Sequence, residues 1–161
     1  MFSLPTLSLK GKVSEQEWQT RVDLAACYRL VADMRWGDLI YTHISAKVPG
    51  TEHYLVNAFG LTFDEVTASN LVKVDLEGNI LDDTPYGINP AGFTIHSAIH
   101  EVRHDAQCVI HLHTLATISV ASVKGGLKPW SQYSMFSLPS LSYHSYEGLA
   151  VDDSEKKRLQ D

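Results

Sequence analysis

The first part of the chain has the apolar spacing of a helix. Between Ser14 and Met34, apolar residues recur every three or four positions. Ser14, with Glu17 three residues later, also forms a capping-box signature for a helix start. We therefore expect a helix over residues 15–34.

The period then changes to two. Between Ile40 and Val48, apolar and polar residues alternate, which predicts a strand with one apolar and one polar face. The polar face carries Tyr41, His43, Ser45 and Lys47. Short apolar runs bounded by turn residues predict hairpin strands at residues 54–57 and 71–75.

Helices and strands are expected to alternate in the second half. Asn89-Pro90 combines a capping residue with proline at the first helical position, so we expect a helix from there to His104. Further elements are a strand over residues 108–113, a helix over 114–123, a strand near 140–143 and a helix that begins at about residue 152. Because hairpins cannot join parallel strands, we expect an α/β fold with a mixed or antiparallel sheet.

Composition and charge limit the function. A chain of 161 residues with 44% hydrophobic and 20% charged residues fits one folded domain, with residues 1–13 as an N-terminal arm and residues 14–161 as the domain. A net charge of −6 offers no basic surface for nucleic acid. No apolar run approaches the roughly 20 residues that cross a bilayer, so we expect a cytoplasmic protein without a membrane partner. Cys27 and Cys108 lie in apolar runs and are expected to be buried thiols.

His111 and His113 are the sharpest candidates for chemistry. Residues two apart on a strand lie about 6.6 Å apart on one face, so these imidazoles can converge on one metal ion such as zinc. Two ligands do not complete a site, because a catalytic zinc usually has three protein ligands. The alternative interpretation is a half-exposed strand that carries two imidazoles without binding a metal.

The remaining histidines are weaker candidates. His96, His100 and His104 align along one stripe of the second helix, which we attribute to ordinary helix packing. His43 and His144 are isolated from other histidines in the sequence. Either is a candidate for the third metal ligand or for a residue that hydrogen-bonds to a ligand. The chain carries no Gly-x-Ser-x-Gly nucleophile motif and no phosphate-binding glycine fingerprint.

Four segments in order resemble the class II aldolase/adducin family, and most closely its adducin-like branch. They are residues 37–45, 55–61, 89–100 and 109–114, and Tyr143-His144 matches a further adducin element. The resemblance covers about residues 18–153 and implies a three-layer α/β/α fold with a divalent metal, zinc in family aldolases, on His111 and His113. The third histidine ligand of the family lies in a later segment, so the domain is expected to be truncated at its C-terminal end, unless His144 or a non-protein ligand substitutes.

The resemblance also indicates a substrate pocket. It comprises His43, Ser45, Phe59, Gly60, Ala91 and Gly92. Family aldolases carry Ser-Ser-Glu where this chain has Pro90-Ala91-Gly92, and their glutamate moves a proton, which glycine cannot do. The family's phosphate-binding residues are largely replaced, by Thr42-His43 and Phe59-Gly60. His43 is the first candidate for a replacement base, because imidazole titrates near neutral pH.

The resemblance leaves two functions open. One is metal-dependent lyase chemistry on a small, unphosphorylated hydroxy-carbonyl compound, in which the metal polarises the carbonyl group. The other is a catalytically inactive, adducin-head-like module for oligomerisation or binding. Family members assemble mainly as tetramers, so a homo-oligomer is expected for both.

Overall fold

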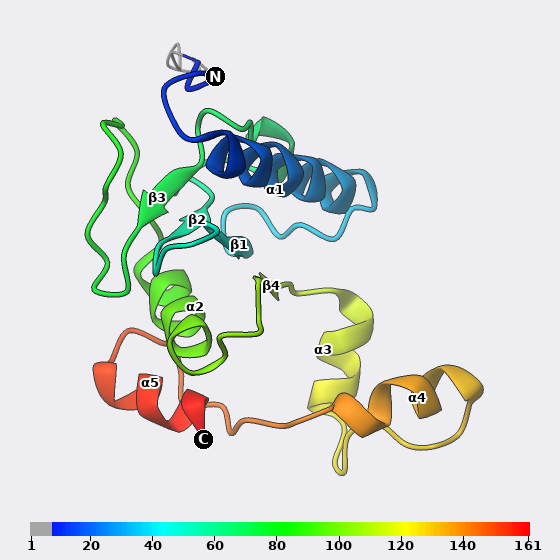
Figure 1. The fold of residues 1–161 in the computed structure, drawn as a ribbon. Helices are drawn as coiled ribbons and strands as arrows, with labels where there is room; N and C mark the ends of the chain where they lie inside the picture. Colours follow the sequence, from blue (N-terminus) through cyan, green and yellow to red (C-terminus); the bar gives the residue numbers. More distant parts are fainter. Residues whose placement is uncertain (1–7) are drawn as a thin grey trace.

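The computed structural model describes residues 8–161 and has a four-stranded antiparallel sheet between two helices (Figure 1). The order of the strands in the sheet is β3-β2-β1-β4, and each pair of neighbours is antiparallel. The strands are β1 (His43–Lys47), β2 (Tyr54–Val56), β3 (Val72–Val74) and β4 (Cys108–His111). Residues 1–7 of the predicted N-terminal arm lie outside the described residues.

Helix α1 (Glu15–Asp33) covers one face of the sheet. It begins where the capping box predicts, with the backbone N–H of Glu17 donating to Ser14 Oγ at 3.1 Å. Its buried residues form an apolar cluster with sheet residues such as Ile44 and Leu55. Burial of each side chain of this size contributes roughly 1.5–3 kcal/mol, so this face supplies most of the apolar core.

Helix α2 (Pro90–Val102) covers the opposite face. The side chain of Asn89 accepts from the backbone N–H of Ala91 at 3.1 Å, which confirms the predicted helix start. The sheet is therefore the middle of three layers, as the predicted α/β/α fold requires. The face of β1 that we expected to be polar is buried beneath α2, and only 2% of His43 and none of Ser45 is exposed.

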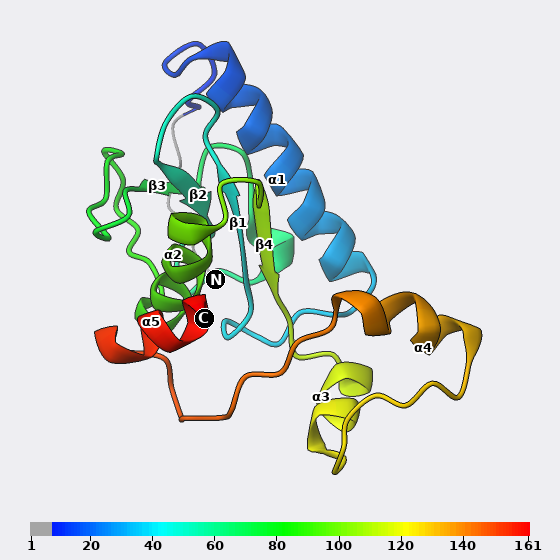
Figure 2. The ribbon, with the colours of Figure 1, turned by 60° about the horizontal axis from the view of Figure 1, so that its bottom comes forward.

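The remaining elements lie mainly outside this sandwich. They are the 3-10 helices η1 (Phe63–Glu65) and η2 (Leu138–Ser140) and the helices α3 (Leu115–Ser122), α4 (Gln132–Ser137) and α5 (Asp153–Gln160). α5 packs on α2, whereas α3 and α4 stand away from the sheet (Figures 1 and 2). No helix within residues 8–161 is both long enough and apolar enough to span a bilayer.

Two local predictions are wrong. Residues 140–143 form no strand, because Leu138-Pro139 begins a 3-10 helix and proline has no N–H for a sheet ladder. Cys108 is exposed rather than buried, because β4 is an edge strand, and Cys27 is half-buried. Both thiols are free.

Candidate metal site and histidine cluster

Three elements bring four histidines together. His43 begins β1 and pairs across the sheet with His111 of β4, so their rings stack with centroids 4.5 Å apart and an angle of 8° between their planes. His96 of α2 approaches His43 from the other layer, with ring centroids 4.7 Å apart. His113 lies two residues after the end of β4 and contacts His111.

The predicted pair converges. Nε2 of His111 and Nε2 of His113 lie 2.9 Å apart. Nδ1 of His113 lies 2.9 Å from Oδ2 of Asp38. Because a carboxylate only accepts hydrogen bonds, Nδ1 carries the proton, and in a neutral ring Nε2 keeps the lone pair that a metal needs.

Asp38 contacts the candidate site, and the sequence reasoning missed it. It lies in the loop between α1 and β1 and is 75 positions from His113 in sequence. Only the antiparallel pairing of β1 with β4 brings the two side chains together. A carboxylate behind a metal-binding histidine is a common arrangement, but no spacing in the sequence connects these two residues.

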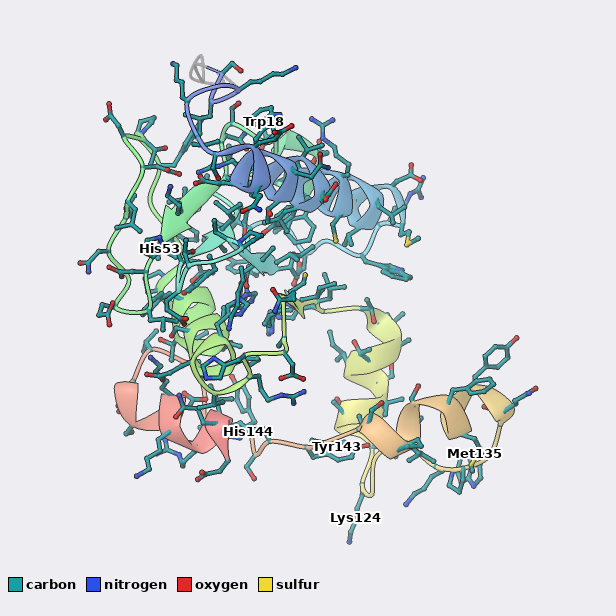
Figure 3. The ribbon with its side chains drawn as sticks, viewed as in Figure 1. Trp18, His53, Lys124, Met135, Tyr143 and His144 are labelled. Carbon is teal, nitrogen blue, oxygen red and sulfur yellow. The ribbon has the colours of Figure 1, made fainter. Side chains whose placement is uncertain are left out.

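The two imidazoles fit a divalent metal as two of its ligands. Imidazole nitrogen binds zinc at about 2.0–2.1 Å, so nitrogens 2.9 Å apart can both reach one ion. Among the side chains that the structure describes, no three of His, Cys, Asp or Glu are arranged to hold a metal. The structure does not bring His144 to the pair: its Nε2 lies 3.7 Å from Glu147 Oε1, beside α5 (Figure 3).

His43 occupies the space next to Gly92. A Cβ atom built on Gly92 would lie 2.9 Å from Cδ2 and 3.1 Å from Nε2 of His43. The imidazole therefore fills the position where a side chain at residue 92 would begin. Burial, followed by the nearby His111 and His113, lowers the pKa of His43 to about 3. The ring is therefore neutral at pH 7, but it is a much weaker base than the near-neutral pKa that made His43 the candidate base would imply.

The other predicted pocket residues differ in their surroundings. Ser45 is fully buried, and its hydroxyl is hydrogen-bonded to His96 and His100 rather than open to a ligand. Phe59 and Gly60 lie in the exposed turn after β2, and Ala91 is half-buried in the first turn of α2. The structure thus joins His43 with Gly92 and leaves Phe59 and Gly60 on the surface.

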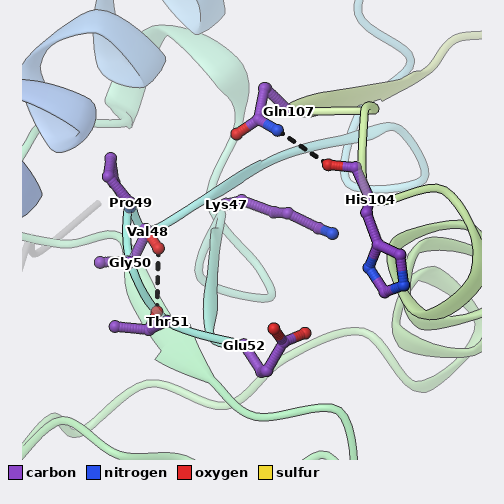
Figure 4. Close-up of a pocket in the computed structure, with 8 residues that line it drawn as sticks. All are labelled: Lys47, Val48, Pro49, Gly50, Thr51, Glu52, His104 and Gln107. Atoms are coloured by element: carbon purple, nitrogen blue, oxygen red, sulfur yellow. Dashed lines mark hydrogen bonds between the residues drawn. The ribbon is translucent and has the colours of Figure 1, made fainter.

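An open hollow lies beside His113. Its volume is about 690 Å³, and it lies between the α1–β1 loop, at Trp36 and Gly37, and the start of α3. A second hollow of about 250 Å³ is lined by Lys47, Glu52 and His104 (Figure 4). Because Lys47 and His43 are at opposite ends of β1, the second hollow is separate from the histidine pair.

The sequence matches a known family over most of its length. Residues 22–160 match the model of the Class II Aldolase and Adducin N-terminal domain. A relative from Pseudomonas aeruginosa, whose name places it with the class 2 aldolases, is 65% identical over 158 residues, which are 98% of this chain and 61% of the relative. Alpha-adducin of Rattus norvegicus is 48% identical over 163 residues, which are 97% of this chain and 22% of that protein.

Solved structures agree with the sequence match. An aldolase II superfamily protein from Pseudomonas syringae has a TM-score of 0.90 and 57% identity, covering 95% of this chain and 62% of that one. An L-fuculose 1-phosphate aldolase from Glaciozyma antarctica has a TM-score of 0.71 and 29% identity, covering 85% of this chain and 55% of that one. The chain spans about three-fifths of the length of the bacterial relatives. It belongs to the class II aldolase and adducin N-terminal domain family.

Proposed function

We propose that this chain carries the metal-binding part of a divalent-metal-dependent lyase that acts on small, unphosphorylated hydroxy-carbonyl compounds. The observation that supports this most directly is the 2.9 Å separation of the Nε2 atoms of His111 and His113 beside a hollow of about 690 Å³. A divalent metal such as zinc, when bound there, supplies Lewis-acid polarisation of a carbonyl oxygen.

The chain's own residues divide the remaining work. Asp38 fixes the orientation of His113 and the position of its proton. His43, neutral and packed against Gly92, is the candidate proton acceptor in place of a residue-92 carboxylate. The substrate is unphosphorylated in this proposal because Thr42-His43 and Phe59-Gly60 replace the phosphate-binding residues that the family resemblance implies.

A catalytically inactive, adducin-like module for oligomerisation or binding is the second candidate. It is favoured by Gly92, which cannot transfer a proton, and by the 48% identity to alpha-adducin. In both proposals the protein assembles as a homo-oligomer, and a tetramer is the expected form.

Metal content is the first test. Elemental analysis of the purified protein should find a transition metal, and a chelator should lower its Tm, because a ligand that binds only the folded state stabilises it. His111→Ala and His113→Ala should each abolish the metal-dependent change in Tm. His53→Ala, in the turn before β2, is the matched control and should retain it.

Activity and assembly then separate the two candidates. The metal-loaded protein is screened for retro-aldol cleavage of unphosphorylated hydroxy-carbonyl compounds, and its mass is measured by light scattering. Cleavage that is lost in His111→Ala supports the lyase. A metal-free protein whose Tm does not respond to zinc or to a chelator would contradict it, and a tetramer in that state would support the binding module.

A further inference from the structure

The turn that ends α1 places an arginine where glycine is usual. The backbone N–H of Arg35 donates to the carbonyl of Ala32 at 2.9 Å, and that of Trp36 donates to the carbonyl of Val31 at 3.1 Å. These two bonds form a Schellman motif, in which the residue with left-handed backbone is usually glycine. Here that residue is Arg35, with a φ of 57°. Because a side chain in this conformation is strained, local structure alone favours glycine at position 35.

The side chain of Arg35 makes no contact within the fold that would offset this strain. Across residues 8–161, its guanidinium has neither a hydrogen-bond partner nor an ion-pair partner. Arg29, also in α1, differs in this respect, because it donates to the carbonyl of Val66 at 3.1 Å. Backbone strain that the surrounding contacts do not explain is a reason to look for a functional role.

Arg35 lines the open hollow beside the candidate metal ligands. Trp36 and Gly37 continue the same wall, and His113 also faces the hollow. Among the residues that line it, Arg35 carries the only permanent charge, and His113 is the only other ionisable side chain. A molecule in this hollow therefore lies between a fixed cation and one of the two histidines proposed to bind a metal.

The loop that carries Arg35 also supports the candidate metal site. Asp38, three residues later, lies behind His113 and is not part of the wall of the hollow. The backbone N–H of Asp38 donates to Oγ1 of Thr42 at 3.2 Å, and the N–H of Tyr41 donates to the carbonyl of Asp38 at 2.9 Å. These bonds, with the Schellman motif before them, fix the path of the loop. They hold the backbone of Arg35 at a constant position relative to His113.

We propose that Arg35 is a specificity-determining residue that binds a carboxylate group of the substrate, so that the substrate is a hydroxy-carbonyl acid. The planar guanidinium can donate two parallel hydrogen bonds to a carboxylate, and it stays charged at physiological pH. Because the chain has a net charge of −6, an anionic substrate needs a local cation of this kind. The inference rests on the proposed function and narrows its substrate class.

The experiment compares the binding of an acid with that of its methyl ester, which lacks the charge. The probes are hydroxypyruvate and 5-hydroxylevulinate, whose carboxylates lie at two different distances from the carbonyl group. Titration calorimetry measures binding to the zinc-loaded protein and to the metal-free protein kept in a chelator. We expect at least one acid to bind about tenfold more tightly than its ester in both states. Arg35→Gln should abolish this preference and leave the affinity for the ester unchanged.

Three further variants separate specificity from overall charge and from stability. Arg103→Gln removes the same charge from an exposed ion pair at the end of α2, so it is the matched control and should keep the preference. Arg35→Lys keeps the charge without the planar fork and should keep only part of the preference. Arg35→Gly should lose the preference but raise the Tm by about 2–4 °C, because glycine adopts the left-handed backbone without strain.

Equal binding of each acid and its ester by the wild type overturns the proposal, as does a preference that persists in Arg35→Gln. A lower Tm in Arg35→Gly would give Arg35 a structural role and would also overturn it. If dihydroxyacetone phosphate binds more tightly than both acids and depends on Arg35, the anion is a phosphate and the carboxylate assignment is wrong. The metal-free titration needs no zinc, so failure here is distinct from failure of the metal-content test.

Discussion

Both faces of the central sheet are buried, but the face beneath α2 carries buried polar side chains beside a smaller apolar cluster. On the α1 side, Ile44 and Leu55 are completely buried in an apolar cluster. On the α2 side, His43, Ser45 and His96 are almost equally inaccessible. Apolar groups are stabilised by burial alone, whereas every buried polar group needs a partner. The larger apolar cluster on the α1 side therefore stabilises the fold by burial alone, whereas the histidines and Ser45 on the α2 side have to pair with one another.

Leu55→Ala should have the largest effect, because it removes a fully buried side chain from the apolar face. We expect the free energy of unfolding to fall by about 2–5 kcal/mol, measured by urea denaturation. Val22→Ala, on the more exposed side of α1, should cost much less. Equal losses for the two variants would contradict the assignment of the core to this face.

Gly92→Glu should disturb the packing between α2 and the sheet face that carries His43 (the histidine face), because its Cβ would overlap the ring of His43. We expect a loss of about 1–3 kcal/mol from overpacking, although glutamate is the better helix former. His43→Ala makes room for the new side chain. In a double-mutant cycle, the combined loss should be smaller than the sum of the single losses by about 0.5–3 kcal/mol. Strict additivity would show that the two positions do not share space.

Acid should weaken the histidine face selectively. The pKa of His100 is lowered to about 4 from an ordinary value of 6.5, so the folded state binds fewer protons than the unfolded chain between these values. The stability contributed by the neutral ring is full above about pH 7 and is lost as the pH falls from 6.5 toward 4.

For His100 alone, we expect the metal-free protein to lose about 1–2 kcal/mol of unfolding free energy between pH 7 and pH 5. His100→Gln should make this dependence shallower, while Ser97→Ala should leave it unchanged. Urea titrations at several pH values measure the slope, and the same slope in wild type and His100→Gln would refute the assignment.

Asp38→Ala should have a small effect that depends on the metal. Because 46% of the Asp38 side chain is exposed, the substitution should change the free energy of unfolding of the metal-free protein by no more than about 0.5 kcal/mol. Zinc affinity should fall at least about tenfold, because His113 loses the partner that orients it. A tenfold loss corresponds to about 1.4 kcal/mol of binding free energy. Titration calorimetry checks this, with Asp23→Ala on exposed α1 as the control. Unchanged affinity would limit Asp38 to a structural role.

Local patterns predicted the elements well because their causes are local. The capping box and spacing placed the first helix at residues 15–34, and α1 runs from Glu15 to Asp33. The alternation in β1 separated its two faces correctly. It did not show what covers them, and the polar face with His43 and Ser45 is buried beneath α2. The same limit concealed the hydrogen bonds of His96 and His100, which were attributed to ordinary packing.

The candidate site was predictable only in part. The spacing of His111 and His113 indicated convergence, and their Nε2 atoms do lie 2.9 Å apart. Metal binding itself stays a prediction. Asp38 was not found because its partner is distant in sequence, and the contact between Gly92 and His43 depends on how α2 lies on β1. Contacts between layers of this kind have no periodic signal in the sequence.

The mutual exclusion of His43 and a side chain at residue 92 makes the order of mutations matter. Two substitutions separate the present arrangement from one with a carboxylate at position 92. Enlarging residue 92 first forces atoms to overlap, whereas shrinking residue 43 first leaves an empty volume and removes the hydrogen bond between His43 and His96. A lineage, or a protein engineer, that moves between the two arrangements therefore avoids the overlap by passing through the variant in which neither side chain fills the gap.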